Sequence, residues 1–314
     1  MIYWDNLLTR GRGSPIWLPE PTSVNDWFRR HGVSIGDVGL LLPTGGFLFL
    51  FNICYPREHE INSGGVPDSF VPLGNSLDPR FISKTSEQPG YSITSSLVKK
   101  RLRPGLRFKS HGKEGAILAL PSGMYSEDLF ATRDFRDYIV QHIVSWYRYI
   151  IHDRRCQIEN GDVRVVTGFS KTSQWGVAAF SESSLPIRLR LQPKNRGQYL
   201  HVWEYTGSCD TRSGPPLSSE TRGSTMASNQ CVFLRTLNAT FCPEAWYKLK
   251  QNNFKKGITN AMNDVEFKRN LPIMTYGVQN AEVSQPHFMG ESKFQEFSYA
   301  IPNVPSAMVS IDLA

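Results

Sequence analysis

The sequence DVRVVTGFSKTSQWGVAAF, residues 162–180, decides the fold of this chain. Apolar side chains dominate Val163–Phe169 and Trp175–Phe180, and the polar residues 170–173 separate the two runs. Short runs rich in valine and aromatic residues favour strands, and polar residues between them favour a turn or loop. We therefore expect two successive strands here, within an antiparallel sheet.

A helical pattern precedes these strands. Apolar side chains recur at steps of three and four residues, at Leu129, Phe135, Ile139, Ile143, Trp146 and Ile150. This spacing predicts one long helix over about 126–152. Ser126 is suited to cap that helix, and Glu127 and Asp128 suit the positive end of its dipole.

Further strands are predicted on both sides. Val38–Leu42 and Phe47–Cys54 flank turn residues and indicate a hairpin, and Gly115–Leu120 is another apolar run. After residue 180 the side chains alternate, with Arg188 and Arg190 among apolar neighbours, and residues 230–240 form one more strand. This order predicts an α+β fold, with a twisted, mostly antiparallel sheet packed around the long helix and an irregular C-terminal tail.

The length of 314 residues gives room for one large domain or about two. We interpret residues 1–242 as the main α+β domain. Residues 55–98 are rich in Pro, Gly, Ser and Asn, and we interpret them as a long irregular connection within that domain. Residues 243–314 form a C-terminal extension, for which we consider a regulatory role.

The positive charge of the chain is concentrated in one segment. The sequence has 35 basic and 28 acidic residues, a net charge of +7, yet residues 243–314 are neutral overall. Residues 99–109 contain no acidic residue and hold six basic ones: Lys99, Lys100, Arg101, Arg103, Arg107 and Lys109. The chain is therefore a nearly neutral protein with one basic segment, unlike a generally basic nucleic-acid binder.

The composition excludes several classes of protein. Hydrophobic residues make up 40% and charged residues 20% of the chain, which is typical of a globular protein and excludes collagen and coiled coils. The five cysteines form no Cys-x-x-Cys pair, so we expect free thiols in a reducing compartment. Residues 1–13 resemble no secretory signal, and no apolar stretch approaches about 18 residues. We therefore expect a cytoplasmic protein, which a membrane could recruit through its surface.

A search for catalytic and metal-binding motifs favours no enzyme class. The sequence has no His-Glu-x-x-His, no zinc-finger spacing, no phosphate-binding glycine loop and no Gly-x-Ser-x-Gly elbow. We therefore predict no catalytic residue, no metal site and no cofactor, and an enzyme is the less favoured hypothesis. If the protein is an enzyme of unfamiliar type, its polar candidates are His111, Glu114, His201, Glu204 and Asp210.

The basic segment has one structural and two functional interpretations. It could be a solvated loop, or it could bind an anionic surface through Lys99, Lys100, Arg101, Arg103, Arg107 and Lys109. Each basic side chain near an acidic membrane contributes about 1 kcal/mol, and nucleic-acid phosphates would attract it equally. Phe108 is the only aromatic residue within the segment, which disfavours stacking on single-stranded nucleic acid. Acidic membrane lipid is the partner we predict.

Most of residues 15–242 resemble an uncharacterised family common in agaric mushrooms and related fungi. The most specific part of this resemblance extends from Val165–Gly168 to Trp175–Gly176. The similar blocks are residues 32–39, 50–54, 113–129, 135–138, 145–147, 160–180 and 229–237. The resemblance implies a fungal, intracellular origin and implies no activity.

A second resemblance concerns the order of strands and helix. Leu118–Pro121, the long helix, Asp162–Thr167 and the strand Cys231–Arg235 are similar to the pore-forming amino-terminal domain of gasdermins. The similarity implies an α+β domain that binds acidic lipid, oligomerises and refolds strands into membrane hairpins. The chain departs from animal gasdermins, because residues 243–314 are too short for their helical inhibitory domain and residues 30–98 do not align.

Three functional hypotheses follow. The first is a membrane-active, gasdermin-like effector that binds acidic phospholipid and forms pores as a homo-oligomer. The second is a non-catalytic interaction domain in fungi, and the third is an enzyme of unfamiliar type.

Overall fold

The computed structural model describes residues 2–23, 25–74, 77–101, 105–181, 186–194, 200–215, 227–255 and 309–313, with residues 252–255 and 309–313 described by their backbone alone. The chain forms two compact units. One consists of residues 1–238 with the last two residues, and the other of residues 239–312. The sites described below lie in the first unit.

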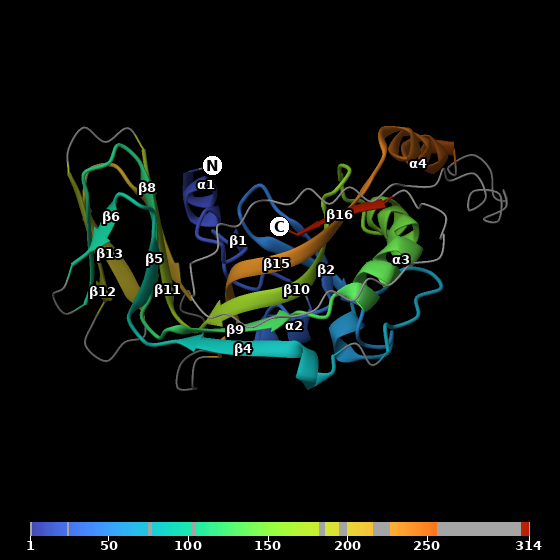
Figure 1. The fold of residues 1–314 in the computed structure, drawn as a ribbon, viewed down its shortest axis with the longest axis horizontal. Coiled ribbons are helices and arrows are strands. Elements are labelled where there is room, and N and C mark those ends of the chain that lie inside the picture. Colours follow the sequence, from blue (N-terminus) through green and yellow to red (C-terminus); the bar gives the residue numbers. More distant parts are fainter. Residues whose placement is uncertain are drawn as a thin grey trace, which may run out of the picture. The chain divides into compact units, whose positions relative to one another are not determined.

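The order of elements is mixed (Figure 1). From the amino terminus they are α1 (Ile2–Leu8), β1 (Ser14–Pro15), α2 (Asp26–His31), β2 (Asp37–Leu41), β3 (Phe47–Asn52), the 3₁₀ helices η1 (Glu60–Asn62) and η2 (Pro79–Phe81), β4 (Ile82–Glu87), β5 (Tyr91–Thr94), β6 (Val98–Lys100), β7 (Leu106–Ser110), β8 (Gly115–Leu120), β9 (Met124–Leu129), α3 (Arg133–His152), β10 (Val163–Thr172), β11 (Trp175–Phe180), β12 (Ile187–Pro193), β13 (His201–Thr206), β14 (Asp210–Gly214), β15 (Gln230–Phe241), α4 (Pro243–Lys255) and β16 (Val309–Leu313). The expected α+β class and the antiparallel sheets are confirmed.

The largest sheet has the strand order β1-β15-β10-β2-β3. Its central strand β10 changes partner along one edge, because Val163–Val165 pairs with β2 and Gly168–Lys171 pairs with β9. Strand β4 then pairs with the outer edge of β9. The hairpin predicted from Val38–Leu42 and Phe47–Cys54 is confirmed as β2 and β3.

Two four-stranded sheets make up a second part of this unit. We name β14-β11-β8-β5 the middle sheet and β13-β12-β7-β6 the outer sheet. They pack face to face through buried side chains that include Phe108, Ile117, Phe180 and Leu189. All residues of β8 and β11 are buried, because other apolar groups cover the second face of the middle sheet.

A single arginine links three strands of the largest sheet to the segment that precedes β1. The guanidinium of Arg235 on β15 forms an ion pair with Asp128 on β9 and donates to Ser170 Oγ on β10 at 3.0 Å. It also donates to the backbone carbonyls of Arg12 at 3.1 Å and Phe169 at 2.6 Å. The strands therefore share one cation as well as their backbone hydrogen bonds.

The long helix is shorter than predicted. Helix α3 begins at Arg133, whereas residues 124–129 form β9, so the expected helix over about 126–152 starts too early. Ser126 does not cap a helix, because its hydroxyl is hydrogen-bonded to Ser170 Oγ at 2.7 Å. The pairing of β9 with both β4 and β10 overrides the local helix signal. The apolar face of α3 is buried, and Trp146 contacts Phe51 edge-on.

The irregular connection predicted over residues 55–98 is also corrected. It contains β4, β5 and the start of β6 in addition to η1 and η2. The apolar pattern does not indicate β4, because its side chains Ser83–Ser86 are exposed. Backbone pairing with β9 holds this strand in place without apolar alternation. Among the described residues, we find no helix with both the length and the apolar character that spanning a bilayer would need.

Candidate functional site: a basic sheet face

The outer sheet separates apolar and basic side chains by strict alternation. On β7, Leu106, Phe108 and Ser110 are buried, while Arg107 and Lys109 alternate with them and are half-buried. On β12, Ile187, Leu189 and Leu191 are buried while Arg188 and Arg190 are exposed. Successive side chains of a strand point to opposite faces, so the basic residues share the face away from the middle sheet.

The register of the strands arranges these residues in two rows. Lys99, Lys109 and Arg188 lie opposite one another across β6, β7 and β12. Arg107 lies opposite Arg190, and Arg101 continues the register through a backbone hydrogen bond to Arg107 of 2.9 Å. We name the six residues of these two rows the basic face: Lys99, Arg101, Arg107, Lys109, Arg188 and Arg190.

The structure therefore places only part of the predicted basic segment on the basic face. Lys99, Arg101, Arg107 and Lys109 join one face, but Lys100 lies opposite Phe108 and belongs to the other side. The Lys100 ammonium donates to the Gly90 carbonyl at 2.6 Å, next to the middle-sheet strand β5. Arg103 lies outside the described residues.

Sequence reasoning missed Arg188 and Arg190 as site residues. Their alternation with buried apolar residues was visible, but the sequence does not reveal which strand lies beside β12. Only the pairing of β12 with β7 adds them to the face. The signal that could have found them is the similar alternation of apolar and basic residues in 106–109 and 187–190.

Like charges meet at close range on the basic face. Residues directly opposite in an antiparallel pair have Cβ atoms about 5 Å apart, and like charges there are destabilising. Within the ranges of β6, β7, β12 and β13, Glu204 is the one acidic residue on this face, and its carboxylate lies 3.7 Å from Arg190. An anionic ligand bound at the basic face would therefore reduce the repulsion between these like charges.

The enzyme candidates do not converge within the described residues. Glu114 accepts a hydrogen bond from Asn6, and Glu204 pairs with Arg190, while Asp210 lies on β14. No group of three His, Cys, Asp or Glu side chains suited to a metal ion occurs in the described part of the chain. Burial raises the pKa of the Cys231 thiol to about 12 and that of Cys209 to about 11, which disfavours a thiolate nucleophile.

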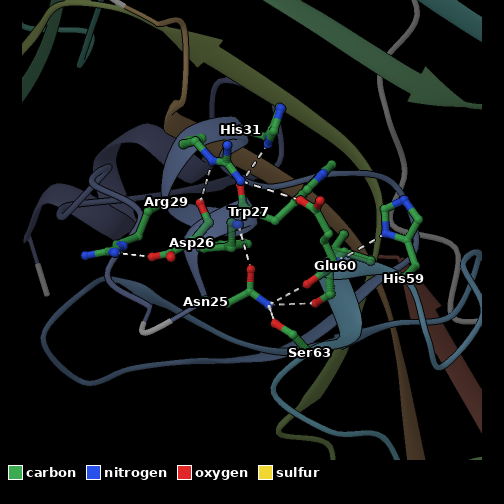
Figure 2. A network of polar contacts seen from close by, with 11 residues as sticks. Asn25, Asp26, Trp27, Arg29, His31, His59, Glu60 and Ser63 are labelled. Carbon is green, nitrogen blue, oxygen red and sulfur yellow. Dashed lines mark hydrogen bonds and ion pairs between the residues drawn. The ribbon is translucent and has the colours of Figure 1, made fainter.

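The cluster of polar contacts around α2, which includes His31 and His59, has a structural role (Figure 2). The Asn25 side chain caps α2 by accepting from the Phe28 amide at 2.8 Å, and its amide donates to the Ile61 carbonyl at 2.9 Å. His59 in turn accepts from the Ile61 amide at 3.2 Å, and its ring faces Trp27 edge-on. These contacts hold the segment around η1 against α2 and use the polar atoms that a ligand would need.

A buried polar pair lies in the largest sheet. The Asp37 carboxylate accepts from Asn52 Nδ2 and from the Ser34 amide, both at 2.7 Å. Burial raises the pKa of Asp37 to about 7, although the two donors and the charge of Lys171 oppose this effect. Burial lowers the pKa of Lys171, whose ammonium donates to the His31 carbonyl at 2.8 Å and lies over the Phe169 ring.

We expect Asp37 to make stability depend on pH. Folding raises the pKa of Asp37, so between about pH 4 and pH 7 the folded state binds the proton more tightly than the unfolded state does. The contribution of Asp37 to the free energy of unfolding is therefore lost as the pH rises through that window. The difference corresponds to at most about 4 kcal/mol in the free energy of unfolding. Urea unfolding at several pH values should show a flatter profile for Asp37→Asn than for the wild type. Parallel profiles would contradict this prediction.

A scan against models of known protein families finds no match to this chain, and a search of curated proteins finds no similar sequence. The role of the basic face is therefore inferred from its geometry and charge.

Proposed function

We propose that this protein binds acidic phospholipid membranes through its basic face, and that bound copies oligomerise into pores, as the gasdermin resemblance implies. One observation carries the binding step. Two rows of like-charged side chains lie at cross-strand spacing, with Glu204 as their one acidic neighbour on the four strands.

The expected strength of attraction fits reversible membrane binding. Six basic side chains at about 1 kcal/mol each, reduced by one for Glu204, give about 5 kcal/mol before entropy and desolvation are counted. Because these side chains project from a regular sheet, they can face a flat surface together. The attraction is electrostatic and should weaken as added salt shortens the Debye length.

The basic face fits a lipid surface better than single-stranded nucleic acid. Stacking of bases requires aromatic side chains among the basic ones. The outward positions of β12 and β13 instead hold Gln192, Val202, Glu204 and Thr206 beside the two arginines. The aromatic residues Phe108 and Trp203 point to the inner side of the outer sheet and join its apolar cluster.

Vesicle sedimentation tests the binding step. We expect the protein to sediment with vesicles that contain phosphatidylserine and to remain in the supernatant with phosphatidylcholine alone. The double variant Lys99→Ser/Lys109→Ser should reduce the affinity for acidic vesicles by about tenfold or more, since each lost charge removes about 1 kcal/mol. Equal sedimentation with both vesicle types would overturn the proposal.

A charge-matched control separates the basic face from net charge. Lys84→Ser/Lys100→Ser removes the same charge from two residues outside the basic face, so its affinity should stay near that of the wild type. Release of an enclosed dye tests the pore step separately. Binding without dye release would refute pore formation, and a protein that binds no vesicle would favour the interaction-domain hypothesis.

A further inference from the structure

An exposed leucine lies at the edge of the basic face. The side chain of Leu97 is 60% exposed, whereas the next residue, Val98, is buried in the apolar cluster between the middle and outer sheets. Because Val98 points into this cluster, Leu97 and Lys99 on either side of it both project outward. Two residues of extended chain span about 7 Å, so Leu97 lies beside the row formed by Lys99, Lys109 and Arg188.

Leu97 belongs to a turn whose backbone is held from both sides. The turn joins β5 of the middle sheet to β6 of the outer sheet, and the Val98 amide closes it by donating to the Ser95 carbonyl at 3.1 Å. Ser95 Oγ accepts from the Ala116 amide at 3.0 Å. Ser110 Oγ donates to the Leu97 carbonyl at 3.2 Å. Backbone contacts therefore fix the position of Leu97, while most of its side chain stays in water.

Leucine is an unusual residue for this turn. Gly, Pro, Asn, Asp and Ser dominate turns, because their backbone or side-chain chemistry suits a turn. Ser95 and Ser96 follow this rule, and Leu97 does not. An exposed leucine also loses most of the stabilisation that its burial would give to the fold. The side chain of Leu97 is therefore available to an apolar surface outside the protein.

The two segments that meet at this turn are basic. Residues 95–101 contain three basic residues and residues 109–113 contain two, and neither segment contains an acidic residue. The segments adjoin because β6 pairs with β7, and a Cβ placed at Gly112 would lie 2.7 Å from Leu97 Cδ1. An apolar side chain next to basic ones suits an acidic lipid surface, whose headgroups attract cations and whose acyl chains accept leucine.

Three other strongly exposed apolar side chains lie elsewhere in the molecule. Phe81 and Phe130 contact each other edge-on, with ring centroids 5.9 Å apart, next to β4 and β9. Val71 is 62% exposed and lies in the connection after β3, where its carbonyl accepts from the Tyr138 hydroxyl. Single exposed apolar residues are common and need no function. The position of Leu97 beside the basic face is what distinguishes it.

We propose that Leu97 is a membrane anchor, which enters the acyl-chain region of the bilayer when the basic face binds acidic headgroups. The inference rests on the proposed binding to acidic membranes and adds an apolar contact to it. A bilayer is favoured over a protein partner, because an apolar protein contact needs a patch of several side chains, whereas one leucine can enter a fluid bilayer. Salt should screen the electrostatic contribution and leave the apolar one unchanged.

Vesicle binding at several salt concentrations separates the two contributions. Leu97→Ser should weaken binding to vesicles that contain phosphatidylserine by about fivefold at every salt concentration. Its plot of log affinity against log salt should therefore run parallel to that of the wild type. Lys99→Ser/Lys109→Ser should instead reduce the slope of this plot. Leu97→Phe, which has a larger apolar side chain, should strengthen binding.

Val71→Ser is the matched control, because it removes an apolar side chain of similar exposure away from the basic face. Its affinity should equal that of the wild type. The melting temperatures of both serine variants should stay within a few degrees of the wild type, since the replaced side chains are exposed. Depth in the bilayer is measured with tryptophan variants. Lipids with brominated acyl chains should quench the added fluorescence of Leu97→Trp and should not quench that of Val71→Trp.

The outcomes distinguish this proposal from the proposed function. If the wild type binds acidic vesicles and Leu97→Ser binds them equally well, the anchor is refuted while binding through the basic face stands. If the wild type binds no acidic vesicle, the proposed function fails and the anchor fails with it. Self-association in lipid-free solution that Leu97→Ser abolishes would assign the leucine to a contact between copies and overturn the anchor.

Discussion

Arg188→Glu/Arg190→Glu should reduce binding to acidic vesicles by about three orders of magnitude. Each replacement exchanges a positive for a negative charge at the exposed surface of β12. The variant therefore loses four elementary charges of attraction, or about 4 kcal/mol, and every 1.4 kcal/mol is about a tenfold change in affinity. Neither arginine belongs to the basic segment 99–109, so this test is specific for the face that the sheet creates.

The same variant should retain its fold. The carboxylate introduced at position 188 would face Lys109 and the one at position 190 would face Arg107, which replaces two repulsive cross-strand pairs by attractive ones. The lost ion pair between Arg190 and Glu204 offsets part of this gain. We expect the melting temperature to stay within a few degrees of the wild type.

A second pair of charge reversals, placed outside the basic face, provides the control. Arg10→Glu/Arg133→Glu changes the net charge equally at two exposed positions outside the basic face, and it should retain most of the affinity. Vesicle sedimentation at increasing salt gives the measurement for all three proteins. If both reversals weaken binding alike, net charge governs binding, and the basic face has no special role.

Gly168→Ala should destabilise the folded protein by about 3 kcal/mol. A Cβ at this position would overlap the Asp128 carboxylate and lie 2.8 Å from Arg235 Nε and 2.9 Å from the Glu127 carbonyl oxygen. The new methyl group would therefore push apart the ion pair between Arg235 and Asp128. Overpacking costs about 1–3 kcal/mol, and a disrupted partly buried ion pair adds to this.

Urea unfolding measures this effect, and two further variants test its cause. Gly74→Ala adds a methyl group where nothing lies within 4 Å, so it should change stability by less than about 0.5 kcal/mol. In an Asp128→Ala background, Gly168→Ala should cost less than in the wild type, because one of the overlapping groups is absent. Equal costs in both backgrounds would show that the ion pair is not the source.

The predictable part of the fold is the part with clear side-chain periodicity. The hairpin of β2 and β3, the strands β10 and β11, and the long helix from residue 133 onward are all visible as apolar patterns. The errors fall where pairing overrides local sequence. Residues 124–129 contain Glu127 and Asp128 beside a serine and imitate a helix start, but they are held as β9 between β4 and β10.

The candidate site likewise contains residues that a sequence pattern reveals and residues that only strand pairing reveals. The sequence identified Lys99 and Lys109, because a run of basic residues is visible without a structure. It also included Lys100, since only the register shows that this lysine lies on the other side. Arg188 and Arg190 could not be assigned, because they are distant in sequence and become neighbours only through the pairing of β7 with β12.

The burial of β8 and β11 on both faces also has an evolutionary consequence. Neither strand presents a side chain to solvent, so a polar replacement at any position would have to be accommodated inside the protein. Strand β4 is the opposite case, since four of its consecutive residues are exposed. Random mutagenesis should therefore find a continuous intolerant stretch in each of the two buried strands, without the every-second-residue tolerance of an ordinary surface strand, while β4 accepts varied side chains at low cost to folding.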